Sequence, residues 1–282
     1  MLNLSDKVSM IETNHPSLNI SKQASMLAMN RGNIYYQPTV ADDSDLANQI
    51  HEIYLKSKCI YGYRKVTAAL ANIGIIANHK RVMKIMRKMN IKGLYPKKRT
   101  NTTISNSNYK FSYLLKDLVI SRPNQVWATD ISYIWLPIGF IYLVAIIDLH
   151  SRYIIAHMVS ISLEAEFCIE TLNNALKTSN KPEIFNSDQG VQFTSNEFIQ
   201  ILLQEQIKIS MDGKGRCFDN IFIERFWRTI KQEDVYYQKY QNVIEAKKSI
   251  GEFIIWYNYE RLHQALGYKT PYQVYAKSNA DY

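Results

Sequence analysis

The sequence predicts an α/β protein, in which a mixed five-stranded sheet flanked by helices follows a smaller helical region. Three observations support this prediction. Three apolar strand-like segments follow one another after residue 123, strands then alternate with amphipathic helices, and the charge balance changes along the chain. Residues 1–120 hold 18 basic and 7 acidic residues, whereas residues 121–282 hold 16 and 18.

The helical region is predicted from apolar residues at helical spacing. The first 40 residues are weakly patterned, with one short helix expected over 21–30. Helices are expected over 43–57 and 64–73, and a turn at 74–77 precedes a third helix that Asn78 caps and that runs to Met89. Two helices joined by a glycine-containing turn, the second rich in cations, are typical of a helix-turn-helix, although an ordinary helical hairpin has the same spacing.

The positive charge of this region favours contact with nucleic acid over a merely solvated face. Residues 56–99 contain 13 basic residues and no acidic one. A dense cationic segment without acids suits the phosphate backbone of DNA. The residues expected to contact DNA are Arg64, Lys65, Lys80, Arg81, Lys84, Arg87 and Lys88.

Residues 96–122 are polar and aperiodic, which predicts a linker. Strands are then expected over 126–135, 140–148, 153–160, 183–186 and 207–211, with a three-residue turn at 137–139. Helices are expected over 164–176, from a capping box of Thr194 and Glu197 to residue 203, and from about residue 220. Trp127 and Trp227 are predicted to be core residues.

Three acidic residues occupy positions where chemistry is a better explanation than chance. Asp130 lies within the first apolar strand, Asp188 follows the short fourth strand, and Glu224 lies on the helix near its start. Buried carboxylates lose hydration unless they are paired or bind a cation, and converging carboxylates are the oxygen ligands that Mg²⁺ prefers. Taken alone, Glu224 fits better with an exposed position on an amphipathic helix. Lys231 lies two turns after it on the same side, so the pair can hold a metal and a phosphate together.

The combined spacing is more specific than any single residue. There are 57 residues between Asp130 and Asp188, and 35 between Asp188 and Glu224. With its flanking motifs the chain resembles the D-D-(35)-E transposases and retroviral integrases, and specifically the second-frame OrfB proteins of insertion sequences of the insertion-sequence-three type. The resemblance covers about residues 40–280, and its motifs are Tyr61-Gly-Tyr-Arg64, Val126-Trp-Ala-Thr-Asp130, Asp148-Leu-His-Ser-Arg152, Phe185-Asn-Ser-Asp188, Asp219-Asn220, Glu224-Arg-Phe-Trp227, Lys231, Tyr257-Asn258 and Arg261-Leu-His263.

The resemblance implies a ribonuclease-H-like core in which Asp130, Asp188 and Glu224 meet at one sheet edge. They would be the catalytic residues and the ligands of two Mg²⁺ ions, with Mn²⁺ as a substitute. Water would first free a 3′-OH at the element's end, and that 3′-OH would then attack another phosphodiester. Lys231 and Asn220 are implied DNA contacts, although Asn220 equally fits a helix cap. Many relatives have His in place of Asn186 and Ser-Arg-Lys-Gly in place of residues 212–215, but neither departure removes an acid.

The resemblance also suggests the role of each part of the chain. It divides the chain into an N-terminal extension (1–40), a helix-turn-helix-like DNA-binding region (41–95), a linker (96–122), an integrase catalytic core (123–240) and a C-terminal helical segment that completes the core (241–282). The implied partners are DNA (insertion-sequence ends and target), the upstream-frame OrfA protein or a fusion with it, and further copies of the chain on DNA. Two glycines, Gly213 and Gly215, suggest a mobile loop beside the site.

Other classes of protein fit the sequence less well. Three widely spaced cysteines without a C-x-x-C pair argue against disulfides and Cys-rich zinc sites, and the longest apolar run, Ile138–Ile147, is half the length of a membrane span. These features predict a protein of a reducing cytoplasm without membrane contact, and the resemblance implies that the cell is bacterial and that the protein is associated with the nucleoid. A regulator with a decayed catalytic part and a standalone nuclease are the alternatives. Asp148 is expected on the same face as Asp130, which would let it approach the site, but a structural role is favoured for it. Asn258, Arg261 and His263 fit either contact with DNA or fixing of the C-terminal helix, and the structural role is favoured.

Overall fold

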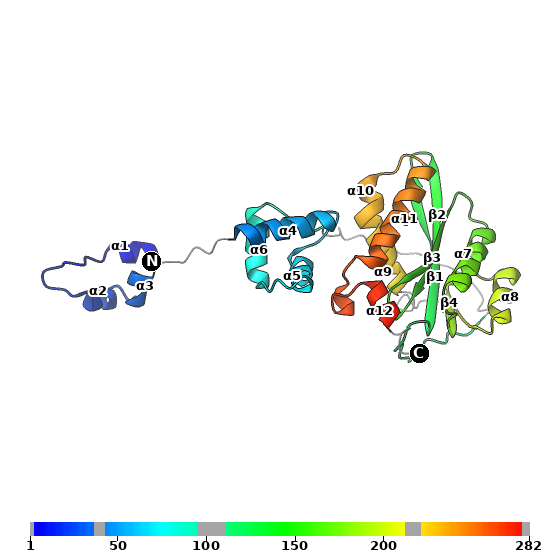
Figure 1. Ribbon diagram of the computed structural model, residues 1–282, viewed down its shortest axis with the longest axis horizontal. Coiled ribbons are helices and arrows are strands. Elements are labelled where there is room, and N and C mark those ends of the chain that lie inside the picture. Colours follow the sequence, from blue (N-terminus) through cyan, green and yellow to red (C-terminus); the bar gives the residue numbers. More distant parts are fainter. Residues whose placement is uncertain (1–2, 37–42, 95–110, 212–220, 278–282) are drawn as a thin grey trace. The chain divides into compact units, whose positions relative to one another are not determined.

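The computed structural model describes residues 3–36, 43–94, 111–211 and 221–277 (Figure 1). The chain divides into two compact units, Met1–Leu46 and Ala47–Tyr282. The first unit contains three short helices, α1 (Leu4–Ser9), α2 (Ile20–Met26) and α3 (Gly32–Tyr35). The side chains of Asn3 and Asn19 cap the first two of them. No helix in the described ranges combines the length and apolarity needed to cross a bilayer.

The three helices that the sequence predicts come next, and the first of them crosses the boundary between the two units. They are α4 (Ser44–Lys56), α5 (Tyr63–Asn72) and α6 (His79–Lys88). Asn78 caps α6, because its Oδ1 accepts a hydrogen bond from the Lys80 N–H at 2.8 Å. The apolar face of α6 is buried at Val82, Ile85 and Met86, which leaves its cations exposed.

A close backbone contact ties the ends of this helical region together. A Cβ on Gly93 would lie 2.6 Å from the Cα of Gly62, so these two backbones approach more closely than any side chain allows. Beside them the Leu94 N–H donates to the Ile60 carbonyl at 3.1 Å. The loop that precedes α5 is therefore packed against the segment that follows α6.

The sheet has the predicted five strands in the order β3-β2-β1-β4-β5. They are β1 (Val126–Leu136), β2 (Gly139–Asp148), β3 (Ile154–Ser160), β4 (Ile184–Ser187) and β5 (Lys208–Met211). β1, β2 and β3 are antiparallel, whereas β4 and β5 run parallel to β1. The predicted fold, a mixed five-stranded sheet with helices on its faces behind a helical region, is confirmed.

Helices cover both faces of the sheet (Figure 1). On one face, α7 (Ala165–Thr178) and α8 (Asn196–Gln204) pack into a core that includes Trp127, Phe185 and Phe198. On the other lie α9 (Ile221–Ile230), the π-helical segment η1 (Lys231–Val235), α10 (Tyr236–Gln238) and α11 (Val243–Tyr259). A 3-10 turn, η2 (Gln264–Leu266), and α12 (Pro271–Lys277) complete the unit.

The predicted capping box of α8 is wrong. Ser195 is the N-cap, and its Oγ faces the Phe198 N–H at 3.4 Å. The Thr194 hydroxyl instead donates to the Gly190 carbonyl at 3.1 Å. The helix therefore begins one residue later, because the preceding loop already engages Thr194.

The prediction that Asp148 and Asp130 point to the same face of the sheet is also wrong. In the β1–β2 register Asp130 pairs with Ala145 and Asp148 pairs with Trp127, so the two acids point to opposite faces. Asp148 is fully buried and accepts hydrogen bonds from the backbone N–H groups of Asn124 and Ser151, both at 2.7 Å, and from the Ser151 hydroxyl. It organises the turn after β2, which agrees with the structural role predicted for it.

Candidate active site

Asp130 is half-buried in the middle of β1, on the sheet face covered by α9. Its Oδ1 accepts a hydrogen bond from the Ile131 N–H at 2.8 Å, and its Oδ2 accepts one from the indole Nε1–H of Trp227 at 2.9 Å. Both bonds orient the carboxylate. The second bond shows that Trp227, which the sequence predicts only as a core residue, contacts Asp130 directly.

The strand register brings Asp188 beside Asp130. β4 pairs in parallel with β1, with Asn186 opposite Ala128, and each aspartate follows two residues later. Both therefore lie at the same edge, where the carboxyl ends of parallel strands meet. The Oδ1 of Asp188 accepts the Gly190 N–H at 2.9 Å, and a Cβ on Gly190 would lie 3.0 Å from that oxygen.

The electrostatics couple the three acids. Burial, the neighbouring Asp188 and the more distant Glu224 raise the pKa of Asp130 to about 7, against the lowering effect of its two hydrogen bonds. Loss of hydration also raises the pKa of Asp188, opposed by the Gly190 N–H. Negative charge is thus concentrated around Asp130, which favours a cation there.

Glu224 lies in the first turn of α9, one helical turn before Trp227, and its side chain is exposed. Loss of hydration raises its pKa and the Arg228 guanidinium lowers it. Among the residues that the structure describes, no three His, Cys, Asp or Glu side chains are close enough to hold a metal ion together. The three acids are therefore electrostatic neighbours around Asp130 without forming a closed coordination site.

Lys231 opens η1, directly after α9, and is half-buried. Burial lowers the pKa of its ammonium, and the Asp130 carboxylate raises it, so the cation lies within electrostatic reach of that acid. Asn220 and the glycine pair at 213 and 215 lie outside the described residues.

The predicted DNA-contacting residues of the helical region divide into two groups. Lys65 is half-buried, with its Nζ 4.9 Å from the ring centroid of Tyr61, and burial together with nearby Arg261 lowers its pKa to about 8. The remaining cations are exposed on α5 and α6, at Arg64, Lys80, Arg81, Lys84, Arg87 and Lys88.

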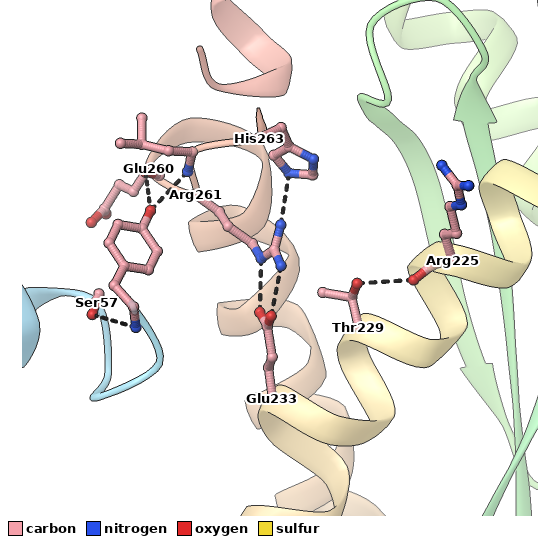
Figure 2. Close-up of polar contacts among 9 residues, drawn as sticks. Ser57, Arg225, Thr229, Glu233, Glu260, Arg261 and His263 are labelled. Carbon is pink, nitrogen blue, oxygen red and sulfur yellow. Dashed lines mark hydrogen bonds and ion pairs between the residues drawn. The ribbon is translucent and has the colours of Figure 1, made fainter. Parts of the chain in front are cut away.

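A buried polar cluster joins Tyr61, the segment after α11 and η1, the segment that directly follows α9 (Figure 2). The Tyr61 hydroxyl accepts the Leu262 N–H at 2.7 Å and donates to the Glu260 carbonyl at 3.3 Å. Next to it, Arg261 makes two bonds to Glu233 on η1, at 2.6 and 2.7 Å, and its Nη1 lies 3.2 Å from His263.

The structural roles predicted for three C-terminal residues are confirmed by these contacts. Arg261 is 8% exposed, and His263 packs edge-on against the Tyr257 ring. The Asn258 amide bonds both backbone groups of Ile154, on β3, at 2.9 Å. These side chains fix the C-terminal segment to the rest of the fold.

Comparison with known proteins gives this arrangement its context. Two protein-family models described as "Integrase core domain" match residues 120–217 and 205–271. A third, described as "HTH-like domain", matches residues 41–99. The "Transposase for insertion sequence element IS904" of Lactococcus lactis is 33% identical, with 80% of this chain and 91% of that protein covered. This chain belongs to the insertion-sequence transposases.

Further similarities extend the comparison. "Transposase InsF for insertion sequence IS3A" of Escherichia coli is 28% identical to this transposase, with 80% of this chain and 81% of that protein covered. The solved HTLV-2 integrase catalytic core domain in complex with magnesium covers 55% of this chain at 21% identity, with a TM-score of 0.46. Because its integrase core domain and its curated relatives are those of transposases, the protein is a polynucleotidyl transferase that cleaves DNA and transfers strands. Both the family and the activity implied by the sequence motifs are confirmed.

Proposed function

We propose that Asp130, Asp188 and Glu224 are the catalytic residues of this transposase, and that they hold two Mg²⁺ ions for which Mn²⁺ can substitute. The observation that carries this proposal is the β1–β4 register, which brings Asp130 and Asp188 to one edge of the sheet, beside the helix α9 that carries Glu224 and bonds Asp130 through Trp227. Carboxylate oxygens are hard ligands, and a divalent cation offsets the repulsion among three of them.

The bound metal pair would activate the attacking oxygen and neutralise the leaving oxygen of an in-line displacement at phosphorus. The chain's own residues fix the geometry. Trp227 and the Ile131 N–H hold the Asp130 carboxylate, and the Gly190 N–H holds that of Asp188. Lys231 places a positive charge beside Asp130 that suits the scissile phosphate.

The same residues serve two successive displacements. Water attacks the phosphodiester at the element's end, and the strand leaves with a free 3′-OH. That 3′-OH then attacks a second phosphodiester and joins the strands, so each step exchanges one P–O bond for another. Neither step consumes ATP.

Nicking of a supercoiled plasmid in Mg²⁺ tests the catalytic assignment. Asp188→Asn should abolish nicking while leaving duplex binding intact, because only the charge of one oxygen ligand is lost. The control is Glu205→Gln, which changes an exposed acid outside the site. Equal nicking by the Asp188 variant and the wild type would refute the assignment. An oligonucleotide strand-transfer gel then separates a transposase from a nuclease that only hydrolyses.

We propose that the exposed cations of α5 and α6 bind DNA phosphates, without Lys65, whose ammonium packs on the Tyr61 ring. Arg87 and Lys88 occupy the last turn of α6 and have exposed side chains. Replacing either with alanine should weaken duplex binding and lower the slope of log affinity against log salt by about one. Lys56→Ala is the matched control, since Lys56 already pairs with Glu52 at 2.7 Å. An unchanged slope would remove α6 from the interface.

We further propose the following division of the chain: an N-terminal extension (1–40), a DNA-binding region (41–95), a linker (96–122), a catalytic core (123–240) and a C-terminal segment that completes the core (241–282). The upstream-frame OrfA protein, or a fusion with it, supplies specificity for the element's ends. No heptad pattern is visible in this chain, and two ends must be joined in one assembly, which requires several copies on DNA. A mobility-shift assay tests this: a fusion with the OrfA protein should bind terminal-repeat DNA selectively, whereas this chain alone should not. Equal selectivity would contradict the proposal.

A further inference from the structure

A pocket of about 660 Å³ lies between the outer half of β1 and the η1–α10 segment. It exists because β1 is longer than its parallel neighbour. β4 pairs with β1 only from Val126 to Ala128, whereas β2 accompanies β1 as far as Leu136. Beyond Asp130, β1 therefore has a strand on one side only, and η1 and α10 line the pocket on the other.

Aromatic side chains dominate the strand side of this pocket. Tyr133, Trp135 and Phe140 line it, and they are 51%, 65% and 56% exposed. The β1–β2 register places Trp135 opposite Phe140, and the ring of Tyr133 packs edge-on against that of Phe140. A cluster of aromatic side chains exposed to water is unusual on a protein that has no partner, and it indicates a binding surface.

The charged groups of the pocket indicate what kind of ligand it takes. Lys231 and Lys239 line it, and no Asp or Glu of the described chain does. Lys231 also lies within electrostatic reach of Asp130, so this wall of the pocket faces the neighbourhood of that acid. Aromatic rings beside ammonium groups match the two parts of a nucleotide, a flat base and a phosphate.

We propose that this aromatic pocket receives an unpaired nucleotide of the DNA strand that adjoins the phosphodiester at Asp130. Its base stacks on Trp135 and Tyr133, and its phosphate lies at Lys231. The path runs around the unpaired edge of β1, since Tyr133 and Trp135 point to the opposite face from Asp130 and β4 pairs with β1 only as far as Ala128. This inference rests on the proposed catalytic role of Asp130 and adds a subsite for the unpaired end of the substrate.

The experiment compares two DNA probes with the full chain in Ca²⁺, which supports binding without cutting. One probe is a blunt duplex, and the other carries a 3′ overhang with 2-aminopurine at the first unpaired position. Stacking of that base should quench its fluorescence on binding to the wild type. Trp135→Ala should weaken overhang binding about 5- to 150-fold and abolish the quenching, with blunt-duplex binding unchanged.

The matched control is Tyr237→Ala, because Tyr237 is 69% exposed on α10 but does not line the pocket. Equal overhang binding by the two variants would overturn the proposal. So would a change in the sedimentation of Trp135→Ala without selective loss of overhang binding, since the pocket would then hold a second copy of the chain. Plasmid nicking is measured in parallel: a wild type that nicks but lacks overhang selectivity refutes the pocket alone, whereas equal nicking by wild type and Asp188→Asn refutes the catalytic assignment.

Discussion

Removing one partner of the ion pair between Arg261 and Glu233 should be among the most destabilising single substitutions in this transposase. Its side chains are only 10% and 13% exposed, and two hydrogen bonds join them. Burial alone would lower the pKa of Arg261, but the Glu233 carboxylate outweighs burial and raises it. Arg261→Met removes one partner and leaves a buried, uncompensated carboxylate, which should cost about 3–5 kcal/mol. That is a large part of the roughly 5–15 kcal/mol that stabilises a typical fold.

Urea unfolding followed by tryptophan fluorescence measures this cost. The double variant Arg261→Met/Glu233→Leu should recover most of the lost free energy, because two apolar side chains replace the pair. Lys56→Met supplies the matched exposed pair: its nitrogen lies 2.7 Å from Glu52, but the two side chains are 73% and 54% exposed, so water screens the pair and its loss should cost far less than the loss of Arg261. If Arg261→Met cost no more than Lys56→Met, burial would not determine the strength of this interaction and the reasoning would fail.

Three further predictions follow from the contacts described above. Trp227→Phe removes the hydrogen bond to Asp130, and the Mn²⁺ concentration needed for half-maximal nicking should rise about 10- to 100-fold; an unchanged requirement would show that the indole has no such role. Gly93→Ala should destabilise the helical region by about 1–3 kcal/mol in urea unfolding, because its Cβ would meet backbone at 2.6 Å. Gly251→Ala, in α11 and with no atom within 4 Å, should instead stabilise the protein by about 0.5–1 kcal/mol; similar effects of the two would contradict the packing argument. Burial, followed by the charge of the neighbouring arginine, lowers the pKa of His263 to about 2, so below pH ~6.5 only the unfolded chain takes up this proton. Stability should therefore fall by up to about 1.4 kcal/mol per pH unit below that point, and His263→Gln should remove this part of the slope when both are unfolded in urea at several pH values.

Most of the fold could be predicted because its elements carry strong local signals. The helix capped by Asn78 and the five strands follow from periodicity and from residues that end an element. The predicted direction of the Asp148 side chain was wrong because of the length of the β1–β2 loop. A three-residue turn was expected, but Leu136 pairs with Gly139 and the loop has two residues. A register slip of one residue moves a side chain to the opposite face, so loop length decided the outcome.

The candidate site was predicted less completely than the fold. The spacing of the acids identified Asp130 and Asp188, which the β1–β4 register brings together. The hydrogen bond from Trp227 to Asp130 could not be predicted from the local sequence. A tryptophan on the apolar side of a helix is predicted to be a core residue whether or not its indole N–H bonds a carboxylate. The π-helical turn at Lys231–Val235 was also missed, since five mixed residues carry no periodic pattern. The position of Lys65 against Tyr61 depends on tertiary packing, which charge counts do not contain.

The bond between Asn258 and Ile154 has a consequence for how the protein behaves at high concentration. β3 is the outermost strand on its side of the sheet, and an outermost strand can recruit another polypeptide as an extra strand. The carboxamide of Asn258 already occupies the main-chain N–H and C=O of Ile154, so an incoming chain finds no free backbone groups at that residue. Strand addition is therefore hindered at the start of β3, where a new strand would otherwise begin to pair.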